Sequence, residues 1–155
     1  MQNILLLALF IILIILIIFL KVPGEKSGEI NIKLRISYLV PFMMGIRLLL
    51  AGIVQVTKPS YTAKLINVPN NCSFVIRELG FTNIVLGALG IGQYFIKDTK
   101  SRALISGGLA LFISQATVQH MLLGEDLSNA IPDLIQSALL ITSTGITISL
   151  SLNEK

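Results

Sequence analysis

Long apolar segments separated by short polar connections constrain this chain more than any other feature. A helix rises about 1.5 Å per residue, so roughly 20 apolar residues cross the hydrocarbon layer of a bilayer. Hydrophobic residues make up 54% of the chain and the mean hydropathy is +0.83, both well above the values of ordinary soluble domains. The sequence therefore predicts an all-α integral membrane protein with five transmembrane helices, at residues 4–20, 38–56, 74–96, 103–123 and 131–152.

These spans divide the chain into an N-terminal transmembrane anchor, residues 1–21, and a four-helix transmembrane bundle, residues 38–152. The first span has the position of a secretory signal, but no basic residue precedes it and no small-residue cleavage motif follows it. We therefore expect a retained anchor. Because every side chain from residue 4 to residue 20 is apolar, we expect this anchor to be a passive tether with no part in a polar site.

Basic residues in the connections predict the orientation, because basic loops stay in the cytoplasm. One side of the membrane would carry Lys21, Lys26, Lys33, Arg35, Lys97, Lys100, Arg102 and Lys155, and the other only Lys58 and Lys64. This bias predicts a multi-pass protein of the cell (inner) membrane with its N-terminus outside and its C-terminus in the cytoplasm. The net charge of +4 then reflects topology and attraction to anionic lipid, and we expect no nucleic-acid partner.

Polar residues within the spans are the candidate site, because charge inside a membrane is costly and marks function by default. The predicted orientation places Arg47 near the middle of the membrane and the others towards its outer half. We expect them to form one polar cluster, consisting of Arg47, Gln55, Arg77, Glu78, Asn83, Gln119, His120 and Asp133. The inner half is expected to be mainly apolar, with Ser and Thr.

Depth and sign suggest how the charged members of this cluster pair. We expect ion pairs between Arg47 and Glu78 and between Arg77 and Asp133, since neighbours on one helix diverge by about 100° and must face different partners. Amides such as Gln55 have a simpler interpretation as interhelical contacts, each worth on the order of 1 kcal/mol. Snorkelling of Arg77 and Asp133 to the surface is an equal alternative to a site role.

Small residues predict where helices approach closely. The third span carries Gly80, Gly87 and Gly90 on one face, and the fourth carries Gly107 and Ala110 in a similar rhythm, so we expect these two spans to pack together. The Pro59-Ser60 pair predicts the start of a short interfacial helix over residues 61–66. A mildly polar stripe on the last span, Ser137, Thr144, Thr147 and Ser151, is expected to face the bundle or line a narrow path.

Gly45-Ile46-Arg47-Leu48 with Gly52, Gln55 and Pro59, and Arg77-Glu78-Leu79-Gly80-Phe81 with Asn83 and Gly87, carry a family likeness. From Met43 to about Ile141 the chain resembles an uncharacterised bacterial family of small multi-pass membrane proteins, distantly similar to DoxX-like four-helix proteins. That family has a Gln-His pair and a later Asp, which Gln119, His120 and Asp133 match. Thr82 and Pro132 depart from its pattern. The family has no assigned activity, so the resemblance supports the residue list alone.

Function is therefore predicted only by class. We favour a module that binds or moves a small amphiphile, such as a lipid or quinone, with Arg47 or Arg77 meeting an acidic or carbonyl group. The alternatives are a membrane enzyme or oxidoreductase subunit that uses Glu78 and His120 for proton transfer, and a structural subunit. A single Cys and a single His predict no disulfide, no metal site and no bound cofactor. Membrane lipids are the expected partners, and the sequence leaves open a second copy or a partner membrane protein.

Overall fold

The computed structural model describes residues 2–26, 28, 30–65, 68–122 and 127–153, apart from the side chains of residues 2–10, 70, 120, 127–130, 132 and 133. The described residues contain helices and no strand. The α-helices of this described part are α1 (Gln2–Phe19), α2 (Ile32–Thr57), α3 (Pro59–Leu65), α4 (Ser73–Gly92), α5 (Thr99–Leu122) and α6 (Leu127–Asn153). Short 3-10 helices at Asn70–Cys72 and Gln93–Phe95 precede and follow α4. The predicted all-α class is confirmed.

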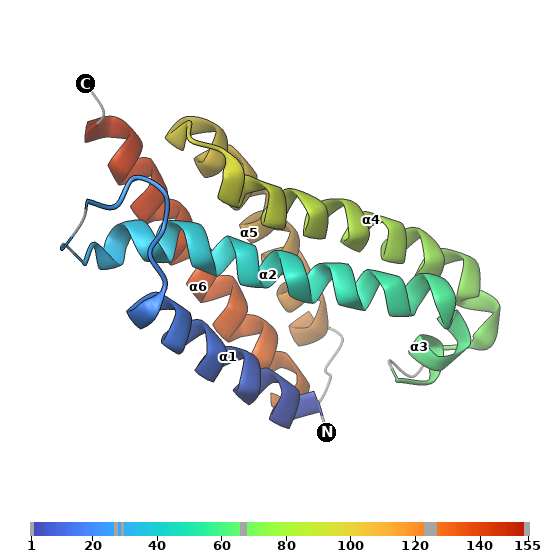
Figure 1. Ribbon diagram of the computed structural model, residues 1–155. Helices are drawn as coiled ribbons and strands as arrows, with labels where there is room; N and C mark the ends of the chain where they lie inside the picture. Colours follow the sequence, from blue (N-terminus) through green and yellow to red (C-terminus); the bar gives the residue numbers. More distant parts are fainter. Residues whose placement is uncertain (1, 27, 29, 66–67, 123–126, 154–155) are drawn as a thin grey trace.

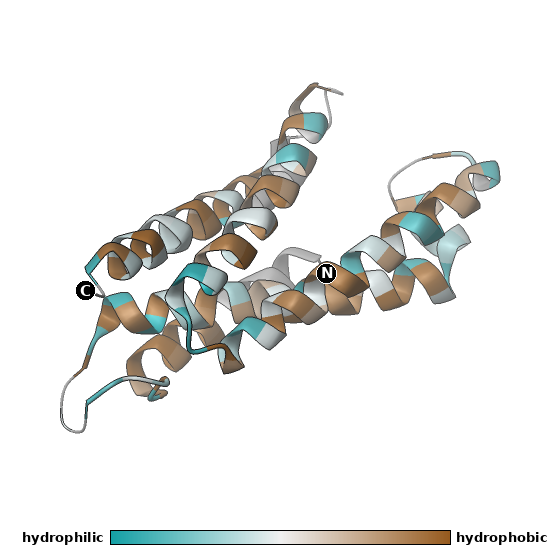
Figure 2. Ribbon diagram, turned by 90° about the horizontal axis from the view of Figure 1, so that it is seen from above, coloured by the Kyte–Doolittle hydropathy of each residue, from teal (hydrophilic) through white to brown (hydrophobic). Residues whose placement is uncertain are grey.

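The long helices form two antiparallel pairs (Figure 1). Helix α2 packs along α4, and α5 packs along α6. Contacts between α2 and α6 join the pairs, α1 lies against α2, and α4 touches α5 only slightly. The pairs lie closest at the end that carries the C-terminus, here called the C-terminal end, and diverge towards the opposite end, here called the α3 end (Figure 2).

Glycines bring α2 and α4 unusually close. A Cβ added at Gly52 would lie 2.5 Å from the carbonyl oxygen of Gly80, and one added at Gly45 would lie 2.7 Å from that of Gly87. Only glycine leaves room for backbone at these distances. The prediction that the Gly80 and Gly87 face packs against the fourth span is therefore wrong, because this face meets a matching glycine face on α2.

The fourth span packs instead on the last one. A Cβ at Gly107 of α5 would contact the Cγ2 of Thr144 on α6 at 3.7 Å, and the hydroxyls of Thr117 and Ser137 lie 2.8 Å apart across the same interface. Ser137 and Thr147 are buried. The stripe predicted on the last span thus faces the bundle.

Each long helix begins before the residue that the hydropathy predicts, and capping residues explain this for α2 and α5. Asn31 caps α2 by accepting a hydrogen bond from the backbone of Leu34 at 3.0 Å, so α2 begins at residue 32 and not at 38. Asp98 accepts from the backbone N–H of Ser101 at 2.7 Å, and α5 begins at Thr99. These caps satisfy backbone donors that the first turn of a helix leaves without partners. The polar residues that follow each cap therefore become part of a helix.

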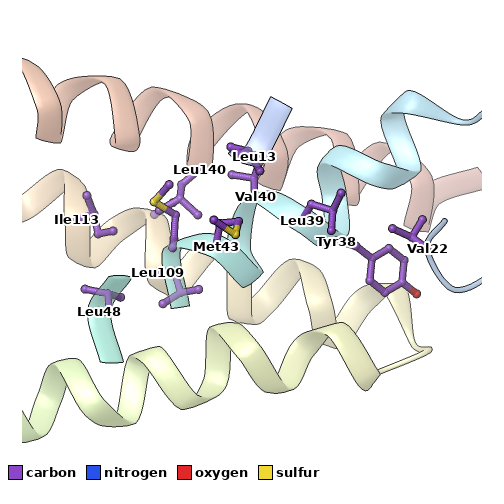
Figure 3. Packing of buried hydrophobic residues seen from close by; sticks show 12 residues of the cluster. Leu13, Val22, Tyr38, Leu39, Val40, Met43, Leu48, Leu109, Ile113 and Leu140 are labelled. Carbon is purple, nitrogen blue, oxygen red and sulfur yellow. The ribbon is translucent and has the colours of Figure 1, made fainter. Parts of the chain in front are cut away.

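The apolar core joins α1 to the bundle (Figure 3). Leu13 of α1 lies near Val40 of α2 and Leu140 of α6 (Figure 3), and all three are buried. Between helices in a membrane such contacts stabilise through van der Waals packing. Helix α1 is therefore packed against the bundle, and the expectation that it takes no part in a polar site stays a prediction.

Among the described residues, three helices are long and apolar enough to cross a membrane, Ile32–Thr57, Ser73–Phe95 and Leu134–Asn153. They correspond to the second, third and fifth predicted spans. Such helices indicate a membrane protein. The short helix predicted after Pro59 is also present as α3, where Pro59 and Ala63 are buried and Tyr61 is exposed.

Candidate functional site

Arg47 joins the two helix pairs. It lies on α2, is half-buried, and its Nη1 donates a hydrogen bond to the Oε1 of Gln136 on α6. Gln136 is fully buried. The Arg47 side chain points away from α4, because Gly45 faces α4 and a residue two positions later lies on the opposite side of the helix. A guanidinium in the middle of an apolar span is thus held by an amide from the other pair.

The ion pair predicted between Arg47 and Glu78 is wrong. Glu78 lies on α4, two residues before Gly80, and Gly80 faces α2. The Glu78 side chain is consequently directed away from α2 and is exposed. Depth and charge sign suggested this pair, but helix rotation separates its members.

Gln55 and Asn83 are brought together as the sequence suggested. The Nδ2 of Asn83 on α4 donates to the Oε1 of Gln55 on α2 at 2.7 Å. Asn83 is buried among the glycines of that interface, and its Oδ1 has no hydrogen-bond partner within the described part of the chain. This contact fits an interhelical hydrogen bond in the closest part of the bundle.

Two further predicted site residues lie on the surface, and two have side chains outside the described residues. Arg77 on α4 and Gln119 on α5 are exposed. His120 and Asp133 lie in α5 and α6, but their side chains fall outside the described residues. The Arg77–Asp133 pair therefore stays a prediction.

A buried cation at the C-terminal end was missed by the sequence prediction. Arg102 of α5 is 1% exposed, and its guanidinium carbon lies 3.6 Å from the ring centroid of Tyr38. The same guanidinium donates to the hydroxyls of Ser37 at 3.3 Å and Thr99 at 3.4 Å, and Gln93 donates to the Tyr38 carbonyl at 3.0 Å. The sequence prediction placed Arg102 in a connection, but α5 begins at Thr99 and Arg102 is buried within it.

One sequence signal indicates this burial. Arg102 shares its helix face with Ser106, Leu109 and Ile113 at spacings of three and four residues, and all of these side chains are buried. An arginine spaced three or four residues from buried positions of the same helix is expected to be buried with them. Counting basic residues in the connections does not separate such an arginine from one in an exposed loop.

A second missed cluster fastens α1. The carboxylate of Glu25 accepts from Arg35 at 2.7 Å and from the backbone N–H of Asn31 at 2.8 Å. The Nη1 of Arg35 donates to the carbonyls of Ile17 at 3.1 Å and Ile18 at 2.5 Å, which lie in the last turn of α1. The hydrogen bond from Arg35, followed by that from Asn31, holds the pKa of Glu25 below its ordinary value of 4.5.

Chemically, Arg47 is the group with the clearest capacity to recognise a ligand, since a guanidinium offers a planar fork of five N–H donors for carboxylate, phosphate or carbonyl oxygen. Among the described residues, no three His, Cys, Asp or Glu side chains lie together as metal ligands would. The feature that the structure shows at Arg47 is a guanidinium hydrogen-bonded to an amide across two apolar helices.

Comparison with known proteins gives one family. A protein-family model described as a family of unknown function (DUF6790) matches residues 3–151. No curated protein and no solved structure matches the chain.

Proposed function

We propose that this chain, which belongs to the family of unknown function DUF6790, is a multi-pass membrane protein that binds a small amphiphile through Arg47. The amphiphile would carry an acidic or carbonyl head group on an apolar body, as a lipid or a quinone does. Its head group would meet the guanidinium between α2 and α6. The observation that carries this proposal is the half-buried Arg47 linked to Gln136 of the other helix pair.

Energetics favour a functional reason for this arginine. A guanidinium cannot lose its proton in a protein, so a mid-span arginine keeps a desolvation cost that an apolar residue would avoid. Gln136 compensates with a neutral carbonyl oxygen. An anionic oxygen from a ligand would add the attraction of opposite charges, since a guanidinium can bind a carboxylate or phosphate through two parallel hydrogen bonds.

The surroundings suit an apolar tail. Exposed apolar residues lie near Arg47 in sequence on α2 and near Gln136 on α6, namely Leu50, Ile53, Leu134 and Ile135. In a bilayer such residues meet acyl chains, so a ligand tail can lie along the exposed apolar surfaces of α2 and α6 in contact with lipid. This arrangement supports entry from the membrane rather than from water.

Five spans with the N-terminus outside are also part of the proposal. Helices α1 and α5 have 18 and 24 residues, long enough at about 1.5 Å per residue to cross most or all of the hydrocarbon layer. Exposed lysines favour a cytoplasmic C-terminal end: Lys21, Lys26, Lys33, Lys97 and Lys100 lie there, against Lys58 and Lys64 at the α3 end. Location in the inner membrane and a distant relation to DoxX-like proteins stay predictions.

The enzyme alternative receives less support. Glu78 is exposed on α4 and directed away from α2, so its carboxylate does not face the Arg47 side chain. A purely structural role stays the second candidate, because Arg47 already has a protein partner in Gln136.

A binding measurement separates these functions. The purified chain in detergent would be titrated with palmitate and, as a neutral match, palmityl alcohol. We expect palmitate to bind about tenfold more tightly, since a hydrogen bond to a charged group is worth about 1.5–3 kcal/mol. Arg47→Gln should remove that preference and Arg77→Gln, at an exposed position, should keep it. Equal binding of acid and alcohol by the unaltered protein would refute the proposal even if Arg47→Gln fails to fold.

A further inference from the structure

A groove at the C-terminal end is separate from the Arg47 site. It has a volume of about 370 Å³ and lies between the first turn of α2 and the last three turns of α6. The lining residues are Lys33, Thr142, Gly145, Ile146, Ser149, Leu150 and Asn153. Figure 1 shows the end of α6 and the start of α2 at the same end of the molecule. The α6 residues follow one another at three- and four-residue spacing, so they form one continuous face.

In the described part of the chain, several residues of this face are uncovered. Thr142, Gly145 and Ser149 are exposed, and a Cβ added at Gly145 would meet no atom within 4 Å. Within the membrane such a face is covered by lipid or by another protein. Its chemistry and dimensions decide between these occupants.

The length of the groove favours a lipid molecule from one leaflet as its occupant. From Asn153 to Thr142 the helix rises about 16 Å at 1.5 Å per residue, which matches half of the roughly 30 Å hydrocarbon core. Along α6 the lining runs from Thr142 past Gly145 and Ile146 to Ser149, Leu150 and Asn153, and Lys33 joins it at the C-terminal end. The one basic side chain of this lining thus lies at the end where a phospholipid carries its phosphate.

Charge favours an anionic lipid. Lys33 is exposed and lies in the first turn of α2, where the helix dipole also favours negative charge. Among the residues that the structure describes, no Asp or Glu lines the groove. The Lys33 ammonium and the start of α2 therefore both attract a phosphate, and the hydroxyl of Ser149 can donate a hydrogen bond to it.

We propose that this groove is a binding site for an anionic phospholipid, with the phosphate at Lys33 and one acyl chain along the Thr142 to Leu150 face of α6. The site uses the membrane orientation given above but not Arg47, so either proposal can fail alone.

The test measures lipid at the protein surface. The full chain would be reconstituted in vesicles of phosphatidylcholine with spin-labelled phosphatidylglycerol, and then with spin-labelled phosphatidylcholine. The immobilised fraction of each probe gives its relative affinity. We expect the phosphatidylglycerol preference to fall about fivefold in Lys33→Gln, the effect of one lysine near a membrane surface. Lys100→Gln is the matched control, because it removes an exposed lysine at the same end but outside the groove.

A second variant blocks the groove without touching charge. Gly145→Leu would fill it, and the side chain would meet no protein atom within 4 Å of its Cβ. Gly108→Leu on α5 has the same open surroundings but lies outside the groove. We expect Gly145→Leu to reduce immobilised phosphatidylglycerol and Gly108→Leu to leave it unchanged. Equal losses in Lys33→Gln and Lys100→Gln, or an unchanged fraction in Gly145→Leu, would overturn the proposal.

Discussion

The carboxylate Oε1 of Glu25 lies 2.7 Å from the Nε of Arg35, and this pair fastens α1 to the bundle. Arg35 uses its other end on the carbonyls of Ile17 and Ile18, which the end of a helix leaves without intrahelical donors. One side chain of α2 thus caps α1 and is fixed by the connection between the helices. The first helix is therefore attached by directed hydrogen bonds as well as by apolar packing.

Arg35→Lys is expected to loosen α1. A lysine keeps the charge but has a single ammonium in place of a planar fork, so it cannot contact the carboxylate and both carbonyls in the same geometry. We expect a lower melting temperature in detergent and faster proteolysis between α1 and α2. Lys33→Arg, two residues earlier and exposed, is the control. A melting temperature equal to that of the unaltered protein would show that the cap contributes nothing.

Acid should weaken the same attachment. Arg35 and the Asn31 backbone hold the pKa of Glu25 below 4.5, so the ionised carboxylate stabilises the fold above that value. This stabilisation is lost as the pH falls from 4.5 through the lower folded pKa. Melting temperatures measured from pH 6 downwards should fall for the unaltered protein and fall less for Glu25→Gln.

Asp98 is expected to make a second, separate contribution to the loss of stability in acid. Its pKa is also lowered, chiefly by the hydrogen bond from the Ser101 side chain, and it should lose stabilisation in the same direction. Asp98→Asn should therefore remove a separate part of the acid sensitivity. Identical pH profiles for the unaltered protein and Glu25→Gln would contradict the role given to Glu25.

Gly52→Ala should separate α2 from α4. The added Cβ would lie 2.5 Å from the Gly80 carbonyl oxygen, so backbone must move, at a cost of about 1–3 kcal/mol typical of overpacking. The open position Gly108 offers the matched change, because Gly108→Ala meets no atom within 4 Å and should be neutral or stabilising. Unfolding in a detergent and denaturant series would measure the difference. Equal stability of the two variants would contradict the close packing.

Tyr38→Leu should destabilise the protein more than Tyr38→Phe. The Arg102 guanidinium lies 3.6 Å from the ring centroid, and phenylalanine keeps an aromatic face whereas leucine does not. A desolvated cation–π contact is worth about 2 kcal/mol, which sets the expected gap in the free energy of unfolding between the two variants. If both variants lose the same stability, the ring face does not hold Arg102.

Local patterns in the sequence determined the elements of this fold. Apolar runs predicted the long helices, and Pro59 with Ser60 predicted α3, because both depend on neighbours along the chain. The stripe containing Ser137 and Thr147 was placed correctly on the bundle side of α6. The first residues of α2 and α5 were predicted less well than the apolar parts of these helices. Hydropathy ends a predicted span where charged residues begin, whereas the caps at Asn31 and Asp98 start each helix before those charged residues.

Partners, in contrast, were decided by the tertiary structure. Gly80 and Gly87 showed that a close contact exists but not with which helix, although Gly45 and Gly52 repeat the same seven-residue spacing. Arg47 was expected to pair with Glu78, yet its hydrogen-bond partner is Gln136. The rotation of each helix about its axis and the register between helices arise only when all apolar faces pack together. Composition and periodicity therefore specify which segments are helical and which faces are buried, while the meeting of two side chains from different helices depends on the whole bundle.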